Sequence, residues 1–229
     1  MRFVEQVMGM PASIEVPHET AAGAVFAWLR DVDRRFSPFR PDSEVRTGRH
    51  SRELTEVLDL CAAYERETDG AFRVQLPDRP LDPCGVIKGW AVQQAADLLR
   101  AAGITEFCLN VGGDIVAAGR PWSIGIRHPD QALRVCAVLE VDGGAVATSG
   151  TYESGHHIID GRTGRPVRDL VSLTVVADDL TTADAVSTAA FAMGVEGIAW
   201  ADARPGCLVF AVDANREVHR SPGLARMLR

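Results

Sequence analysis

Asp184 and Thr188 are the two residues whose types and spacing point most directly to chemistry. They lie four positions apart in the segment TTADAVSTAAF, so on a helix their side chains share one face, one turn apart. A carboxylate oxygen and a neutral hydroxyl together suit Mg²⁺, which completes its octahedron with waters and ligand phosphates. A structural alternative stays open. Thr181 and Asp184 have the spacing of a capping box, and a threonine inside a helix often bonds the carbonyl four residues earlier.

The segment LDPCGVIKGWAVQQAA holds a second group of candidates at the start of a predicted helix. A helix N-terminus exposes unpaired N–H groups that suit a phosphate, and Lys88 adds a full positive charge there. Gly85 lets a ligand or a metal approach the backbone closely. Taken alone, this segment favours a simpler interpretation, with Asp82 as a helix cap and Lys88 as a solvated side chain.

Two further segments are richer in glycine and polar residues than folding requires. In AVATSGTYESGHHIIDGRTGRPV, the imidazole of His157 could accept the proton of an attacking hydroxyl. Ser149 lacks the GxSxG context of an acyl-transfer nucleophile. In LNVGGDIVAAG, the two glycines before Asp114 favour a tight hairpin turn over a ligand site.

The hydrophobic pattern predicts helices mixed with strands that are joined by short turns. This order favours an α+β fold with mixed or antiparallel sheets and flanking helices, over a doubly wound parallel sheet. We expect one domain over residues 1–229, either undivided or as two lobes that share a central ligand cleft. The predicted helices are HETAAGAVFAWLRDVDRRF, RELTEVLDLCAAYERETDG, Val86–Ala102, Thr182–Met193 and a short one near Glu196–Ala201. The predicted strands are FVEQVMGM, SIEV, EFCLNV, DIVAAG, WSIGIRH, VCAVLEV, AVATSG, HHIID, LVSLTVVA, CLVFAVD and REVHR.

The composition is that of an ordinary soluble globular protein, with 46% hydrophobic and 24% charged residues in 229. A net charge of −7 argues against a nucleic-acid partner, whose phosphates demand a basic surface. No stretch approaches the roughly 20 apolar residues of a membrane span, so we expect no membrane insertion. We also see no secretory signal, and the five widely spaced cysteines suggest reduced core residues.

Eight segments, taken together and in order, are similar to the ApbE family of FAD:protein FMN transferases. They extend from about Val7 to Gly194. These segments are MGM, SPFRPDSEV, TDGAF, LDPCGVIKGWAVQQAADLL, LNVGGDIVAAGRPWSIGIRHP, AVATSGTYE, HHIIDGRTGRPV and LTVVADDLTTADAVSTAAFAMG. The resemblance implies an enzyme of ApbE-like fold that cleaves FAD with Mg²⁺. It would attach FMN by a phosphoester to a serine or threonine of an acceptor protein and release AMP.

The resemblance also assigns roles to residues. Asp184 and Thr188 match the metal ligands, and Gly85 matches the position whose carbonyl adds a third oxygen. His157 matches the histidine proposed to assist the acceptor hydroxyl. The positions that match flavin-nucleotide contacts are Met8, Phe39, Ala71, Phe72, Arg73, Asp82 and Lys88. In this context we favour the metal interpretation of Asp184 and Thr188 over the capping one.

The chain departs from the family pattern at several positions, which concern the flavin contacts more than the metal site. The departures are Met10, Phe39, Arg73, Pro83, Cys84 and Gly161. The chain is also shorter than typical members and lacks their lipoprotein signal, so we expect a cytoplasmic location. Two alternatives remain: an FAD pyrophosphatase that releases FMN and AMP, and a non-catalytic FAD-binding carrier. The sequence carries no signal for the oligomeric state or for the identity of the acceptor.

Overall fold

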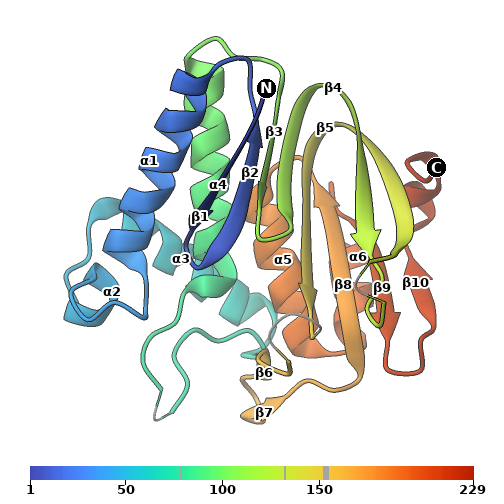
Figure 1. Cartoon of the computed structure of the whole chain (residues 1–229). Helices are drawn as coiled ribbons and strands as arrows, with labels where there is room; N and C mark the ends of the chain where they lie inside the picture. The colour runs from blue at the N-terminus through green and yellow to red at the C-terminus, as the bar shows by residue number, and fades with distance from the viewer. Residues whose placement is uncertain (78, 132, 152–154) are drawn as a thin grey trace.

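An eight-stranded sheet runs through the computed structural model, in the order β1-β2-β3-β4-β5-β8-β9-β10 (Figure 1). The structure describes residues 1–77, 79–131, 133–151 and 155–229, so part of the segment AVATSGTYE lies outside it. Each neighbouring pair of strands in this sheet is antiparallel. The predicted α+β class is therefore confirmed. The strands are β1 (Arg2–Val7), β2 (Met10–Glu15), β3 (Phe107–Val111), β4 (Asp114–Arg127), β5 (Val135–Gly150), β6 (Ile159–Asp160), β7 (Arg165–Pro166), β8 (Leu170–Ala177), β9 (Leu208–Asp213) and β10 (Val218–Arg220).

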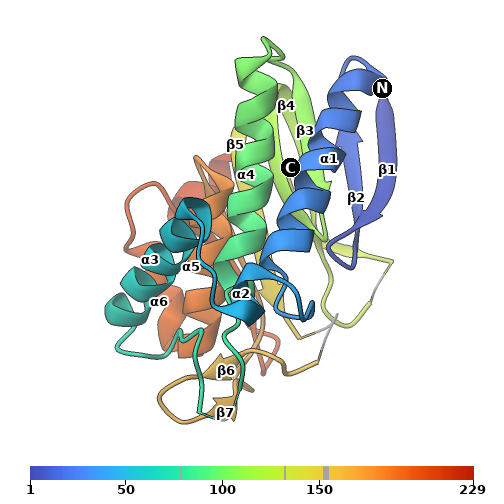
Figure 2. The same ribbon diagram turned by 90° about the vertical axis from the view of Figure 1, so that its left-hand side faces the viewer.

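Helices α1, α4 and α5 lie next to one another against one face of the sheet (Figure 2). Their apolar sides and that face form the larger core, which includes Phe36, Leu109 and Phe191. A second cluster, with Trp122 and Leu139, packs where the long β4–β5 hairpin meets the C-terminal residues. The helices are α1 (Glu19–Phe36), α2 (Glu44–Thr47), α3 (Arg52–Glu67), α4 (Cys84–Ala101), α5 (Leu180–Met193), α6 (Glu196–Asp202) and a 3-10 turn, η1 (Pro222–Arg226).

The structure corrects the predicted strands in one main respect. DIVAAG and WSIGIRH form one strand, β4, and VCAVLEV and AVATSG form one strand, β5. The glycines between these segments bend the strands without ending them: Gly119 has a φ of +85°, and a Cβ there would lie 2.6 Å from the Glu106 Cα. The register shift between Ala117 and Pro121 marks the same irregularity.

Three smaller differences concern short elements. The segment SPFRPDSEVRTGRHS, for which no helix or strand is predicted, contains α2, whose first turn is capped by the Ser43 side chain. The expected strand HHIID shortens to β6, which pairs with β7 as a separate two-stranded sheet. In Figure 1 this hairpin lies at the lower end of the molecule, where β6 contacts α5.

Helix α5 begins two residues earlier than a Thr181–Asp184 capping box would require. Its N-cap is Asp179, whose side chain accepts a hydrogen bond from the Thr182 N–H at 2.9 Å. The capping alternative for Thr181 and Asp184 is therefore wrong. Small residues such as Ala183 and Ala185 fill the helix, so α4 can approach α5 closely, and both sit against the sheet.

The described helices include none that is both long and apolar enough to cross a membrane. All five cysteines are free; Cys61 and Cys207 are buried as expected of core residues, whereas Cys84 and Cys108 are half-buried and Cys136 is exposed. A single domain over residues 1–229 stays a prediction.

Candidate functional site

Asp184 is a buried carboxylate at the contact between α4 and α5. Its side chain is 3% exposed, its Oδ2 accepts the Gly89 N–H at 2.7 Å, and its Oδ1 lies 3.5 Å from the Lys88 Nζ. Burial raises the pKa of Asp184, Lys88 opposes that rise and the Asp114 charge adds to it, leaving the pKa well above its ordinary value. A carboxylate that is buried in this way is stabilised by a nearby cation.

Lys88 supplies a positive charge to the buried carboxylates, because its ammonium group lies between Asp114 and Asp184. It forms an ion pair with Asp114 Oδ2 as well as the longer contact with Asp184. Burial lowers the pKa of Lys88, but the two carboxylates outweigh that effect and the net shift is upward. The interpretation of Lys88 as a solvated side chain is therefore wrong: its side chain is 21% exposed and ion-paired.

Asp114 has a second role beyond the predicted hairpin turn. Gly112 and Gly113 do form the β3–β4 turn, both with positive φ. The Asp114 side chain, 1% exposed, also accepts the Thr148 N–H at 3.3 Å through Oδ1, which holds its Oδ2 toward Lys88.

Gly85 lies where α4, α5 and the Phe72 ring meet. A Cβ at this position would lie 2.9 Å from the Thr188 Cγ2 and 2.8 Å from the Phe72 Cε2, so the site has no room for a side chain. In a regular helix the Gly89 N–H donates to the Gly85 carbonyl. In this protein the Gly89 N–H donates to Asp184 Oδ2, so it is not reserved for the Gly85 carbonyl. The role of the Gly85 carbonyl as a metal ligand stays a prediction.

The Thr188 hydroxyl hydrogen-bonds to Ser149 of β5 at 3.2 Å. The neighbouring Ser187 is the side chain that donates back to the Asp184 carbonyl, at 3.0 Å. The hydrogen bond to the preceding turn that was the alternative for Thr188 is thus made by Ser187 instead. The Thr188 hydroxyl is left for another role. Carboxylate, hydroxyl and carbonyl oxygens form a hard donor set, and the residues present here fit Mg²⁺.

Of the positions expected to contact the flavin nucleotide, three lie on the segment after α3. The side chains of Ala71 and Phe72 are buried, so contacts with a nucleotide would involve their backbone. Arg73 is exposed and its Nε donates to Glu65 at 2.9 Å. Gly161 ties this segment to β6, because its N–H donates to the Ala71 carbonyl at 2.8 Å and a Cβ there would lie 2.4 Å from the Gly70 oxygen.

The other expected contacts come from separate loops. Met8 is half-buried in the β1–β2 turn, with a positive φ of 55°. Phe39, between α1 and α2, is 85% exposed and presents a free aromatic ring. Asp82 accepts the Cys84 N–H at 3.0 Å, and the exposed His157 has its Nδ1 3.0 Å from the Gly155 carbonyl oxygen. The roles of these four residues stay predictions.

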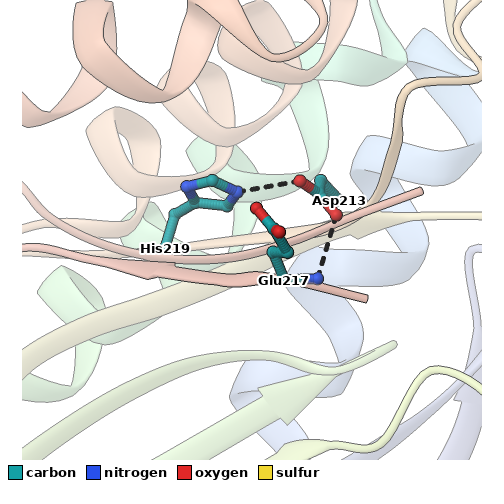
Figure 3. Close-up of side chains that lie close together, drawn as sticks. All are labelled: Asp213, Glu217 and His219. Carbon is teal, nitrogen blue, oxygen red and sulfur yellow. Dashed lines mark hydrogen bonds and ion pairs between the residues drawn. The ribbon is translucent and has the colours of Figure 1, made fainter. Parts of the chain in front are cut away.

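A different group of potential metal ligands lies on the β9–β10 hairpin. Figure 3 shows Asp213, Glu217 and His219, whose ligand atoms lie within 4.8 Å of one another. Asp213 Oδ1 accepts the Glu217 N–H at 3.0 Å and the Asn215 N–H at 2.8 Å, and Oδ2 lies 3.0 Å from the His219 Nε2. These bonds close the turn and account for the cluster without a metal.

Sequence reasoning missed two residues that build the site. Gly89 was not singled out, although a Cβ there would lie 2.5 Å from the Asp184 Cβ and 2.6 Å from the Leu180 carbonyl oxygen. Asp114 was assigned only to a turn. The glycine one position after Lys88 in VIKGWAV was the available signal, because a glycine inside a helix is unfavourable unless another backbone comes close.

The antiparallel sheet and the closely packed α4 and α5 make this an α+β protein. Its candidate ligand site is the cluster of Lys88, Asp184 and Asp114 where the two helices meet the sheet. The ApbE family model matches residues 73–210, and the chain belongs to the ApbE family. It is 32% identical over 170 residues to the FAD:protein FMN transferase of Salmonella typhimurium, covering 68% of this chain and 49% of the relative. It is 31% identical over 193 residues to that of Klebsiella pneumoniae, covering 76% and 61%. The chain thus spans about half to three fifths of these relatives.

Solved structures agree on the fold. The flavin transferase ApbE from Vibrio cholerae superposes with a TM-score of 0.86 at 24% identity, covering 100% of this chain and 99% of that one. The ApbE protein from Thermotoga maritima gives a TM-score of 0.89 at 24% identity with the same coverage.

Proposed function

We propose that this chain is a Mg²⁺-dependent FAD:protein FMN transferase. One observation carries the proposal: the buried Asp184 carboxylate lies 3.5 Å from the Lys88 ammonium group, at the contact of α4 and α5 where Thr188 packs against Gly85. The family membership and the names of the relatives support the same reaction. Asp184, Thr188 and the Gly85 carbonyl would hold the ion, which when bound neutralises the diphosphate and the charge on leaving AMP.

The chain's own residues account for the other requirements of transfer. Lys88 places a positive charge next to the diphosphate, and Phe39 and Met8 are available for the flavin ring. His157 would take the proton of the acceptor hydroxyl. The hydroxyl oxygen then bonds to the FMN phosphorus, the bond from that phosphorus to the bridging oxygen breaks, and AMP leaves with the bridging oxygen.

Two related functions use the same site. In an FAD pyrophosphatase, water replaces the acceptor hydroxyl, so FMN and AMP are released. In a carrier, FAD binds and is handed on intact. A carrier needs no proton acceptor for an incoming hydroxyl, so the presence of His157 favours a catalyst over a carrier.

The experiment combines the purified chain, FAD and Mg²⁺ with and without a peptide that carries a serine or threonine flavinylation motif. A transferase adds the mass of FMN to the peptide and releases AMP in equal amount. AMP released at the same rate without peptide would support the pyrophosphatase. FAD that binds and stays intact in both mixtures would support the carrier.

The partners follow from this proposal. They are FAD and an acceptor protein with an accessible serine or threonine, and no nucleic acid is needed. The cytoplasmic location stays a prediction, under which the acceptors would be cytoplasmic proteins or cytoplasmic faces of membrane proteins.

A further inference from the structure

We propose that Ser149 is a positioning residue that orients the Thr188 hydroxyl for the cation. The inference rests on the proposed function, since it takes Thr188 as a metal ligand. Ser149 lies on β5, one residue before the strand ends, and is 7% exposed. It links the sheet to α5 through two side-chain hydrogen bonds.

Three hydroxyl groups and one carbonyl form a short chain of hydrogen bonds. The Ser187 Oγ donates to the Asp184 carbonyl at 3.0 Å. The Ser149 Oγ lies 3.0 Å from the Ser187 Oγ and 3.2 Å from the Thr188 Oγ1.

The number of hydrogens sets the direction of this chain, because each hydroxyl has one hydrogen to donate and two lone pairs that accept. Ser187 uses its hydrogen on the Asp184 carbonyl, which can only accept. Ser149 must therefore donate to Ser187. Its own hydrogen is then used, so the remaining contact is satisfied only when Thr188 donates to Ser149.

This direction determines what Thr188 offers to a ligand. With its hydrogen directed at β5, the Thr188 oxygen keeps its lone pairs for another partner. A hydroxyl binds a cation through its oxygen, and a hydrogen aimed at the ion would repel it. Ser149 thus acts as the outer hydrogen-bond partner that orients a metal ligand, a role whose loss typically costs 10–100-fold in metal affinity.

The test measures the affinity of the full chain for Mn²⁺, used as a spectroscopic substitute for Mg²⁺, in the presence of saturating FAD. Electron paramagnetic resonance counts the free ion, so the readout is independent of turnover. The variants are Ser149→Ala, Thr188→Val and the double variant. Ser172→Ala is the matched control, because Ser172 is a buried serine on the neighbouring strand β8, opposite Gly150 in the sheet.

We expect Ser149→Ala to weaken Mn²⁺ binding at least tenfold and Ser172→Ala to leave it unchanged. In the Thr188→Val background, Ser149→Ala should weaken it no further, because Ser149 acts through Thr188. The thermal midpoint of each variant separates this effect from loss of the fold.

Two results would overturn the inference in different ways. If Thr188→Val weakens binding but Ser149→Ala does not, the positioning role is wrong and the proposed function stands. If Thr188→Val binds Mn²⁺ as well as the wild type, Thr188 is not a ligand, and the metal assignment fails together with the inference.

Discussion

The Gly89 N–H donates to the Asp184 Oδ2 at 2.7 Å, which joins the backbone of α4 directly to a carboxylate of α5. This bond requires that residue 89 has no side chain, since a Cβ would lie 2.5 Å from the Asp184 Cβ. The two helices therefore approach as closely as their backbones allow, and the carboxylate is held with one oxygen engaged and the other facing Lys88.

We expect Gly89→Ala to separate α4 from α5 and to lower the free energy of unfolding by about 1–3 kcal/mol, the usual cost of overpacking. Binding of Mg²⁺ should be lost with it. The matched control is Gly23→Ala in α1, where a Cβ meets nothing within 4 Å, and alanine there should stabilise the helix by up to ~1 kcal/mol. Urea unfolding and calorimetric Mg²⁺ titration measure both effects. Equal stability of the two variants would contradict the close packing.

Lys88→Met should leave Asp114 and Asp184 buried without their cation. Breaking a buried ion pair from one side typically costs about 3–5 kcal/mol, so the thermal midpoint should fall clearly. Mg²⁺ should raise the midpoint of this variant more than that of the wild type, because the ion would be the only remaining counter-charge for Asp184. Combining Lys88→Met with Asp114→Asn should recover part of the lost stability. A Lys88→Met midpoint equal to the wild-type value would show that the ion pair contributes nothing.

Asp184→Asn retains the size of the side chain and can still accept the Gly89 N–H, but it removes the negative charge. We expect cleavage of FAD at saturating FAD to fall by far more than tenfold, which corresponds to 1.4 kcal/mol in the activation free energy. Glu217→Gln, in the hairpin cluster, is the control and should retain full activity. Release of AMP, followed by chromatography, gives the rate. Activity within tenfold of the wild type would rule out Asp184 as a required metal ligand.

His157→Ala should slow transfer of FMN to the acceptor peptide more than it weakens FAD binding, because the imidazole is expected to act on the acceptor hydroxyl. The exposure of His157 means that the substitution should leave the thermal midpoint unchanged. Single-turnover transfer and fluorescence titration of FAD separate the two effects. An equal loss in both measurements would make His157 a binding residue.

Local patterns were sufficient to predict most helices and many strands. The apolar spacing of α1, α3, α4 and α5, and the glycines that follow the last three of them, are visible within one segment, so the positions of these helices agree with the structure to within a few residues. The bends at Gly119 and at Gly143–Gly144 looked like turns, because a glycine of positive φ serves a bulge and a turn equally well. The continuity of β4 and β5 depends on pairing with distant strands, which no local pattern records.

The candidate site was predictable only in part, for the same reason. The spacing of Asp184 and Thr188 is local, and so is the position of Gly85 and Lys88 at the start of one predicted helix; the family resemblance joined the two segments into one site. The ion pair of Lys88 with Asp114 and the bond from Thr188 to Ser149 join residues from different elements. Such contacts follow from sheet register and helix packing, and they became visible only with the three-dimensional structure.

The bond between Gly89 and Asp184 spans 95 residues of the chain. During synthesis, α4 therefore emerges from the ribosome long before the acid that completes its site. A nascent polypeptide that ends before α5 carries Lys88 but none of the α5 oxygens expected to trap magnesium. On the proposed function, flavin chemistry can begin only after α5 has been translated and has packed against α4.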